Sequence, residues 1–165
     1  MTLTREVPLD PRKSALLFVD VQNFSAHRDG AEFRDLPEAA FQDKYGWYFE
    51  QLEARVIPNM QAIQTACRAA GVEVMYTCIE SLTLDGRDRS LDYKITGFNV
   101  PKGSWDGKVI DQIAPVGDEI VLPKTSSSVF VSTHIDYILR NLGVRQLVIS
   151  GLITDQCVES AIRDA

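Results

Sequence analysis

Four short apolar segments alternate with helix-like segments along this chain, and this alternation limits the possible folds most strongly. The apolar segments span residues 14–20, 71–78, 119–122 and 146–150. The first is almost continuously apolar, which is typical of a central strand that is covered on both faces. Strands that alternate with helices predict a three-layer α/β/α sandwich with a central, mainly parallel sheet. The length of 165 residues fits a single domain, placed at residues 1–165.

The segments between these strands differ in regularity. Residues 23–48 are charged and aromatic, and we expect them to form a lid or a subunit contact. Residues 52–70 have the apolar spacing of an amphipathic helix. Further helices are predicted at residues 104–113 and 132–142, whereas residues 81–102 are predicted to be irregular.

Charge and cysteine content exclude several classes of function. The formal net charge is −6, so no basic surface is expected to bind nucleic acid. No apolar run approaches the roughly 18 residues that span a bilayer, and residues 1–8 lack the pattern of a secretory signal. Three cysteines without a CxxC pair favour a reducing compartment. We therefore expect a cytoplasmic protein with no nucleic-acid partner and no membrane partner.

Chemically active side chains stand where the predicted strands end. Asp20 ends the first apolar segment and Cys78 ends the second; Lys124 follows the third, and Cys157 follows the fourth after a break at Gly151. Ligands of open parallel sheets bind beyond the carboxyl ends of the strands, so we expect these groups at one edge. Cys157 also opens a helix-like segment, where unpaired N–H groups and the helix dipole lower the pKa of a thiol.

Several of these residues also have simpler interpretations. Cys67 belongs to a helical apolar stripe and Cys78 to a strand, so both are expected to fill core positions. A single Asp or Lys is more often a cap or a surface residue than a catalytic group. The hypothesis of a site therefore depends on an acid, an amine and a thiol occurring together at strand ends. His27 and His134 are expected at the surface.

Three longer motifs stand in order along the chain. They are Leu16-Leu-Phe-Val-Asp20-Val-Gln22-Asn23-Phe24, Leu122-Pro-Lys124 followed by Ser128-Val-Phe130, and Gly151-Leu-Ile-Thr154-Asp-Gln-Cys157-Val-Glu-Ser. Together they resemble the isochorismatase-like cysteine hydrolases, a family that includes nicotinamidases and N-carbamoyl amidohydrolases. The resemblance runs from about Ser14 to the last residue and implies a Rossmann-like fold of the isochorismatase type. Relatives continue through one or two further strands and a helix, so we expect this domain to be incomplete at its C-terminal end, with the fourth strand exposed or covered by another subunit.

The resemblance implies a catalytic triad of Asp20, Lys124 and Cys157. Cys157 would attack a carbonyl carbon, Asp20 would pass the thiol proton to the leaving nitrogen, and Lys124 would favour their charged forms. The backbone N–H groups of Ile153 and Cys157 would form the oxyanion hole, and the bond between Leu152 and Ile153 would be cis. The implied activity is hydrolysis of a C–N bond in a small amide, ureido or carbamoyl substrate through a covalent intermediate on Cys157.

Other side chains are candidates for contact with the substrate. Gln22 and Asn23 either hold the Asp20 loop or touch the substrate. Arg87 or Arg89 either binds a substrate carboxylate or forms a surface salt bridge. The substrate-binding candidates are Gln22, Phe24, Glu80, Arg89, Trp105, Ser128 and Phe130.

Departures from the family pattern narrow the range of reactions that the resemblance implies. The Asp-x-His pair of nicotinamidases is absent after the second strand, where the chain reads Thr77-Cys-Ile-Glu80, so we expect no metal and no cofactor. Residues 85–94 and 102–105 are most similar to the ureidoacrylate and carbamoyl-amide branch. An isochorismatase-type or nicotinamidase-type hydrolase is the alternative, and a truncated, non-catalytic scaffold is an alternative of another class. The expected partners are a small-molecule substrate and a second copy of the chain, in a dimer or tetramer.

Overall fold

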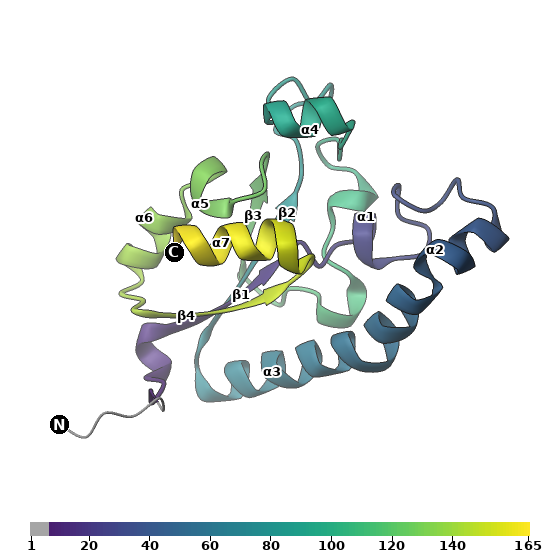
Figure 1. Ribbon diagram of the computed structural model, residues 1–165. Helices are drawn as coiled ribbons and strands as arrows, with labels where there is room; N and C mark the ends of the chain where they lie inside the picture. The colour runs from purple at the N-terminus through teal and green to yellow at the C-terminus, as the bar shows by residue number, and fades with distance from the viewer. Residues whose placement is uncertain (1–6) are drawn as a thin grey trace.

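A computed structural model describes residues 7–165 and contains a four-stranded parallel sheet with helices on both faces (Figure 1). Residues 1–6, which make up most of the segment searched for a secretory signal, lie outside the described residues. The strand order is β3-β2-β1-β4, and the predicted strands shift only slightly at their ends. The strands are β1 (Ser14–Val19), β2 (Glu73–Ile79), β3 (Ile120–Lys124) and β4 (Gln146–Gly151).

The central strand β1 separates two hydrophobic cores. Successive side chains of a strand point to opposite faces, and all six residues of β1 are buried. Ala15, Leu17 and Val19 belong to one core, which also contains residues of α4 to α7. Leu16 and Phe18 belong to the second core, together with residues of α2 and α3. A strand buried on both faces requires a continuously apolar sequence, and β1 has one.

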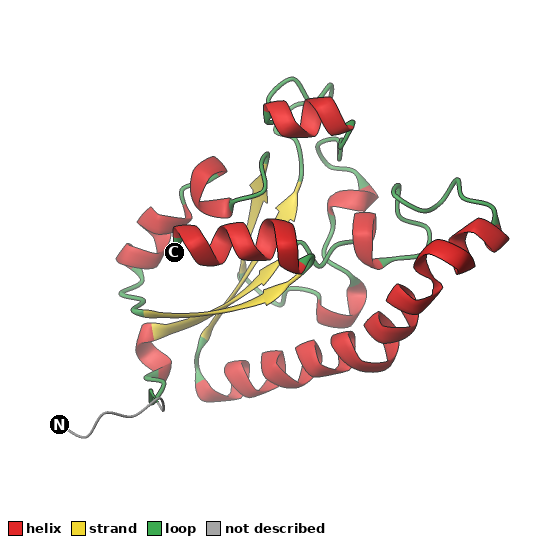
Figure 2. Ribbon diagram, viewed as in Figure 1, coloured by secondary structure: helices red, strands yellow, loops and turns green. Residues whose placement is uncertain are grey.

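Helices form the two outer layers of the sandwich. Helix α3 runs along one face of the sheet, and α5, α6 and α7 lie on the other (Figure 2). A π-helical turn, Leu52–Val56, joins α2 to α3. The helices are α1 (Asn23–Ala26), α2 (Glu38–Gln51), α3 (Ile57–Ala70), α4 (Leu91–Thr96), α5 (Val129–Ser132), α6 (Ile135–Asn141) and α7 (Glu159–Asp164).

Three expectations about local structure need correction. The second half of segment 23–48 is helical, because Phe41 and Phe49 of α2 bury against the second core and supply tertiary support that periodicity does not reveal. The helix predicted at 132–142 is present as α6 but begins only at Ile135, because the extended backbone of Thr133 separates it from α5. Residues 81–102, predicted to be irregular, contain the short helix α4.

The prediction of one helix at residues 104–113 is also wrong. The structure has two separate 3₁₀ turns instead, at Trp105–Gly107 and Asp111–Ile113. Between them, Val109 pairs with Gln22 in an isolated antiparallel bridge. This pairing requires an extended backbone, which interrupts the helical pattern and ties the segment to the loop after β1.

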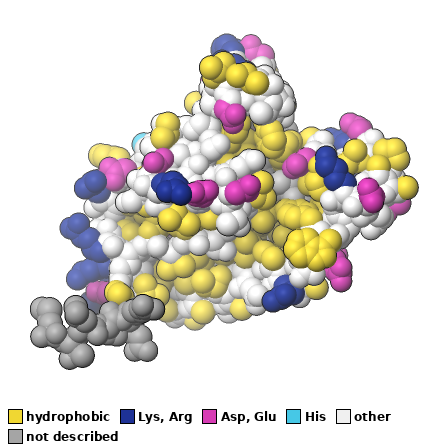
Figure 3. Space-filling model, in the orientation of Figure 1, with side chains coloured by type: hydrophobic (Ala, Val, Ile, Leu, Met, Phe, Trp, Pro, Cys, Tyr) yellow, Lys and Arg dark blue, Asp and Glu magenta, His cyan; other side chains and the backbone are white. Residues whose placement is uncertain are grey.

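Strand β4 forms one edge of the sheet and is half-buried along its whole length. Figure 3 shows hydrophobic side chains gathered on the surface below α7, along β4 and toward α2. An edge strand presents unpaired backbone groups to its surroundings, so this side of the described chain is open to pairing. Within residues 7–165, no helix is both long and apolar enough to cross a membrane.

Candidate active site

The carboxyl ends of three strands bring Asp20, Lys124 and Cys157 together. Asp20 directly follows β1, Lys124 is the last residue of β3, and Cys157 lies in the helical turn after β4. Lys124 Nζ is 2.9 Å from Asp20 Oδ2 and 3.2 Å from Cys157 Sγ. The three residues are buried, with exposed fractions of 2%, 0% and 4%. An acid, an amine and a thiol therefore share one buried position at the edge where parallel sheets bind ligands.

The backbone at Asp20 helps to orient its carboxyl group. Its φ angle is 55°, in the left-handed region that few residues with side chains adopt, although Asp tolerates it. The Asp20 N–H donates to the Thr77 carbonyl at 2.9 Å, and the Ser25 hydroxyl donates to the Asp20 carbonyl at 3.3 Å. These bonds hold the residue at the end of β1 in the unusual conformation that places its carboxylate beside Lys124.

The carboxylate of Asp20 is able to accept a proton. Lys124 approaches Oδ2 as an ion pair without the alignment of a hydrogen bond, and neither oxygen has a hydrogen-bond partner among the described residues. Burial raises the pKa of Asp20 above its ordinary value, and the charge of Lys124 opposes this rise. A buried carboxylate with a raised pKa and free lone pairs suits a general base.

Lys124 connects the members of the site. Its ammonium donates to the Ser126 carbonyl at 2.9 Å and to the Tyr93 hydroxyl at 3.3 Å, besides its contact with Cys157. Burial alone lowers the pKa of Lys124, but the negative charges of Asp20 and Cys157 outweigh this effect and raise it. Lys124 therefore remains an ammonium and holds the acid and the thiol in position.

The thiol of Cys157 is less acidic than the sequence suggested. Burial raises the pKa of Cys157 to about 11; Asp20 adds to the rise and Lys124 opposes it. The helix start that was expected to lower the pKa is a five-residue π-helical turn, Thr154–Val158, and Cys157 packs in the first hydrophobic core. Removal from water thus outweighs the favourable position. A thiolate at Cys157 would therefore require a neighbouring base to take the proton.

Tyr93 of α4 also belongs to this site, and the sequence candidates did not include it. Its hydroxyl lies 3.7 Å from Cys157 Sγ and accepts a hydrogen bond from Lys124. The side chain is buried, and its ring stacks on Phe98 with 5.6 Å between centroids. Burial raises the pKa of Tyr93, so the hydroxyl keeps its proton and can donate to the sulfur. The sequence carried no signal for this role, because Tyr93 lies far from every strand end.

A cavity of ≈ 250 Å³ opens onto Asp20 and Cys157. Segment 23–48, for which a lid or subunit contact was expected, supplies one wall of it, largely through aromatic side chains. The residues that line the cavity are Asp20, Phe24, Ser25, Glu32, Phe33, Tyr45, Tyr48, Ile79, Phe98, Leu152, Ile153, Gln156 and Cys157.

Among the substrate-binding candidates, only Phe24 lines this cavity. Gln22 instead holds the loop, the first of its two proposed roles. Its amide accepts a hydrogen bond from the Ile79 N–H at 2.6 Å and donates to the carbonyls of Ile79 and Asp106. Glu80 accepts from the Gly103 N–H and fixes the neighbouring loop. Both side chains are occupied by backbone groups and are placed away from the cavity.

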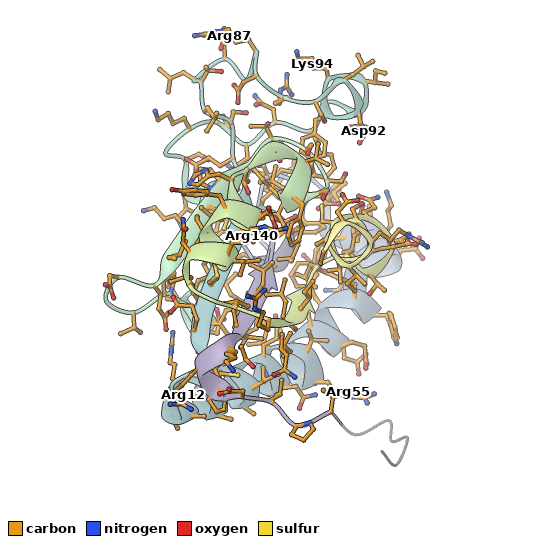
Figure 4. The ribbon with its side chains drawn as sticks, turned by 90° about the vertical axis from the view of Figure 1, so that its left-hand side faces the viewer. Arg12, Arg55, Arg87, Asp92, Lys94 and Arg140 are labelled. Carbon is orange, nitrogen blue, oxygen red and sulfur yellow. The ribbon has the colours of Figure 1, made fainter. Side chains whose placement is uncertain are left out.

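The two arginine candidates also have partners outside the cavity. Arg89 donates to the carbonyls of Gly86 and Phe98, and Arg87 pairs with Asp85 at 2.9 Å. Figure 4 shows Arg87 at the outer end of the segment that carries α4, together with Asp92 and Lys94. Contact between Arg89 and a substrate carboxylate therefore stays a prediction, and in this structure the guanidinium group is engaged by backbone carbonyls.

The remaining three candidates lie outside the cavity for separate reasons. Trp105 is 44% exposed and stands edge-on to His27, with 5.0 Å between ring centroids. Ser128 is buried immediately before α5, and Phe130 packs against the first hydrophobic core. The positions of Ser128 and Phe130 depend on how α5 packs against the first core, which the local sequence does not specify.

The segment between β4 and Cys157 lines the cavity through Leu152, Ile153 and Gln156. The peptide bond between Leu152 and Ile153 is cis, as the resemblance implied. The Ile153 carbonyl accepts hydrogen bonds from the N–H groups of Gln156 and Val158. Ile153 and Cys157, whose N–H groups are the oxyanion-hole candidates, both line the cavity.

The fold and the site define an α/β protein with a buried cysteine beside an Asp–Lys ion pair at the ligand-binding edge of a parallel sheet. The family model described as the Isochorismatase domain matches residues 14–165. The chain belongs to this family of isochorismatase-like cysteine hydrolases.

Solved structures are similar to most of this chain. A cysteine hydrolase from Pseudomonas syringae pv. phaseolicola 1448A has a TM-score of 0.78 and 25% identity, covering 96% of this chain and 68% of that one. For N-carbamoylsarcosine amidase from Thermoplasma acidophilum the values are 0.66 and 27%, with coverages of 93% and 75%. A nicotinamidase from Bacillus subtilis shares the fold, with a TM-score of 0.62, 21% identity and coverages of 92% and 77%.

Proposed function

We propose that this protein hydrolyses a C–N bond in a small amide, ureido or carbamoyl substrate through a covalent intermediate on Cys157. The observation that carries the proposal is the placement of Lys124 within 2.9 Å of Asp20 and 3.2 Å of Cys157, where the cavity opens onto the acid and the thiol. Similarity to an N-carbamoylsarcosine amidase supports the choice of a carbamoyl or amide substrate.

The first step forms the covalent bond. The Cys157 sulfur attacks the substrate carbonyl carbon while its proton passes to Asp20, which is the base that the high thiol pKa requires. Negative charge develops on the carbonyl oxygen, where the N–H groups of Ile153 and Cys157 are the proposed donors. Tyr93 and Lys124 stabilise the sulfur until the C–S bond has formed.

The next steps release both products. Protonated Asp20 donates its proton to the leaving nitrogen, the C–N bond breaks, and ammonia or an amine departs from the thioester or thiocarbamate. Asp20 then takes a proton from a water molecule, whose oxygen attacks the same carbon and breaks the C–S bond. The proton returns to the sulfur, and the free acid or carbamic acid leaves.

A screen for ammonia release tests this proposal. The substrates are ureido acids, carbamoyl amino acids, biuret and nicotinamide, and the variants are Cys157→Ser and Cys78→Ser. Cys78 is a matched control because it is also buried but does not line the cavity. We expect release by the wild-type protein and by Cys78→Ser only. Release that persists in Cys157→Ser would contradict the covalent mechanism.

We also propose that the protein is a homo-oligomer in the cytoplasm. The half-buried edge strand β4 and the apolar surface along it support self-association. The three cysteines are free, which suits a reducing compartment. Light scattering of the purified chain tests the first part, and a monomer at micromolar concentration would contradict it.

A further inference from the structure

We propose that the cavity selects substrates whose non-reacting end carries an ammonium group, held between aromatic rings and the carboxylate of Glu32. The inference rests on the proposed function, because that function places the reacting carbonyl beside Cys157. It adds a chemical class of substrate, which the catalytic residues alone do not specify.

The aromatic wall is suited to a cation. Phe33 lies at its centre, with ring centroids 4.9 Å from Tyr45 and 6.5 Å from Tyr48. The Tyr48 hydroxyl donates to the Ser25 carbonyl at 2.9 Å, which fixes this ring in the wall. The faces of aromatic rings carry negative charge density and attract ammonium groups, most strongly where water is excluded.

The same aromatic cluster already receives cations outside the cavity. Lys44 Nζ lies 5.0 Å from the centroid of the Tyr45 ring, and Arg28 Cζ lies 3.9 Å from that of Phe41, which packs near Phe33. Neither Lys44 nor Arg28 lines the cavity. Two rings of this cluster therefore carry cations from the chain itself, and the cavity presents Phe33, Tyr45 and Tyr48 of the same cluster to a ligand.

The charges around the cavity favour a cationic ligand over an anionic one. Asp20 and Glu32 are the charged side chains among the described residues that line it. Lys124 neutralises Asp20. Glu32 has Lys44 nearby but forms no ion pair with it within 4.0 Å, so among the described residues its carboxylate is available to a ligand. Glu32 is an exposed residue, and the partial removal of its carboxylate from water raises its pKa, while the nearby charge of Lys44 opposes the rise. An ammonium group in the cavity would stabilise this carboxylate further, whereas a second carboxylate would be repelled.

Arginine side chains that could reverse this balance are engaged elsewhere. Arg34 forms an ion pair with Asp106, and Arg28 donates to the carbonyls of Phe33 and Leu36. A substrate carboxylate in the cavity therefore meets no guanidinium group from the described residues. The cavity differs in this respect from a site that recognises carbamoyl amino acids through their carboxylate.

Two amides of nearly identical shape provide the test. Trimethylammonioacetamide and 3,3-dimethylbutanamide differ only in the replacement of a quaternary nitrogen by carbon, and succinamate is the anionic comparison. Their dissociation constants are measured by calorimetry on Cys157→Ala, so that binding is observed without turnover. We expect the cationic amide to bind roughly tenfold more tightly than the neutral one, and succinamate to bind most weakly.

Variants then show which residues cause the preference for the cationic amide. Glu32→Gln in the Cys157→Ala background should remove most of the cationic preference. Glu50→Gln, at an exposed position of α2 that does not line the cavity, is the charge-matched control and should retain the preference. Tyr45→Leu removes a ring without changing charge and should also reduce the preference. Equal binding of the two isosteres, no binding of the cationic amide, or a preference unchanged in Glu32→Gln would overturn the inference.

Turnover by the wild-type protein separates this inference from the proposed function. Cationic preference in binding without ammonia release from any amide would reject C–N hydrolysis and keep the ammonium site. Ammonia release without cationic preference would keep the hydrolase and reject the ammonium site.

Discussion

Lys124 Nζ lies 3.2 Å from Cys157 Sγ, although Lys124 ends β3 and Cys157 follows β4, the strands at opposite edges of the sheet. Strands β2 and β1 separate β3 from β4, so the contact depends on the reach of the lysine side chain and on the helical turn that carries Cys157 back over the sheet. The same lysine pairs with Asp20. One side chain thus sets the relative positions of the proposed base and nucleophile.

Asp20→Asn should abolish most of the activity while leaving the fold intact. Asparagine has the shape of aspartate but cannot accept the thiol proton, so we expect a loss in kcat of about 10²–10⁴. Ammonia release and circular dichroism are the measurements. Asp136→Asn, an exposed residue on α6, is the matched control and should retain full activity. Near wild-type turnover by Asp20→Asn would mean that another group is the base.

Lys124→Met should destabilise the protein. The substitution leaves the Asp20 carboxylate buried without its partner, and the loss of one partner of a buried ion pair typically costs about 3–5 kcal/mol. Urea denaturation measures the free energy of unfolding, with the exposed Lys102→Met as the control. An unfolding free energy equal to that of the wild type would show that the ion pair contributes nothing to the fold.

The pH dependence of activity should follow Asp20. The carboxylate form is the proposed base, so activity should fall as pH drops through the pKa of Asp20, which burial raises above the ordinary value near 4. Where Lys124→Met remains folded, the opposing positive charge is lost, and the acid limb of kcat/KM should move to higher pH. A shift to lower pH, or none, would contradict the assignment of Asp20.

Tyr93→Phe should reduce activity without unfolding the protein. The ring and its stacking on Phe98 remain, but the hydroxyl group beside Cys157 and Lys124 is removed. We expect kcat/KM to fall roughly tenfold, as for the loss of one hydrogen bond to a charged group. The melting temperature should change little, and Tyr137→Phe, exposed on α6, should behave as the wild type. Unchanged kinetics in Tyr93→Phe would assign the hydroxyl a packing role only.

Gln22→Leu should affect stability rather than substrate binding. The variant leaves the buried Ile79 N–H and the Asp106 carbonyl without their partner, at a cost of about 1–3 kcal/mol for each unsatisfied group. We expect a lower unfolding free energy and an unchanged KM. A raised KM at unchanged stability would instead return Gln22 to the substrate site.

The sequence predicted the sheet and the meeting of three side chains, because both depend on local signals. Apolar runs such as that of β1 mark buried strands, and topology brings the ends of parallel strands to one edge. The meeting of Asp20, Lys124 and Cys157 could therefore be predicted from the sequence, whereas their catalytic roles are what the family resemblance implies. The strand assignments needed only small shifts at their ends.

Contacts that depend on tertiary packing could not be predicted in this way. Tyr93 reaches the thiol from a segment that the sequence indicated as irregular, and Glu32 reaches the cavity from the loop before α2. The raised pKa of Cys157 also depends on burial in the first core, which a helix-start pattern does not report. Gln22 could be a loop or a substrate residue until its three hydrogen bonds were located.

Mass spectrometry of the enzyme quenched during turnover tests the covalent mechanism most directly. With an amide that releases ammonia, we predict that the peptide containing Cys157 gains the mass of the acyl or carbamoyl group, and that the peptides containing Cys67 and Cys78 do not. The modification should disappear after the substrate is consumed. Ammonia release with no adduct on Cys157, or turnover that persists in Cys157→Ala, would contradict the central claim.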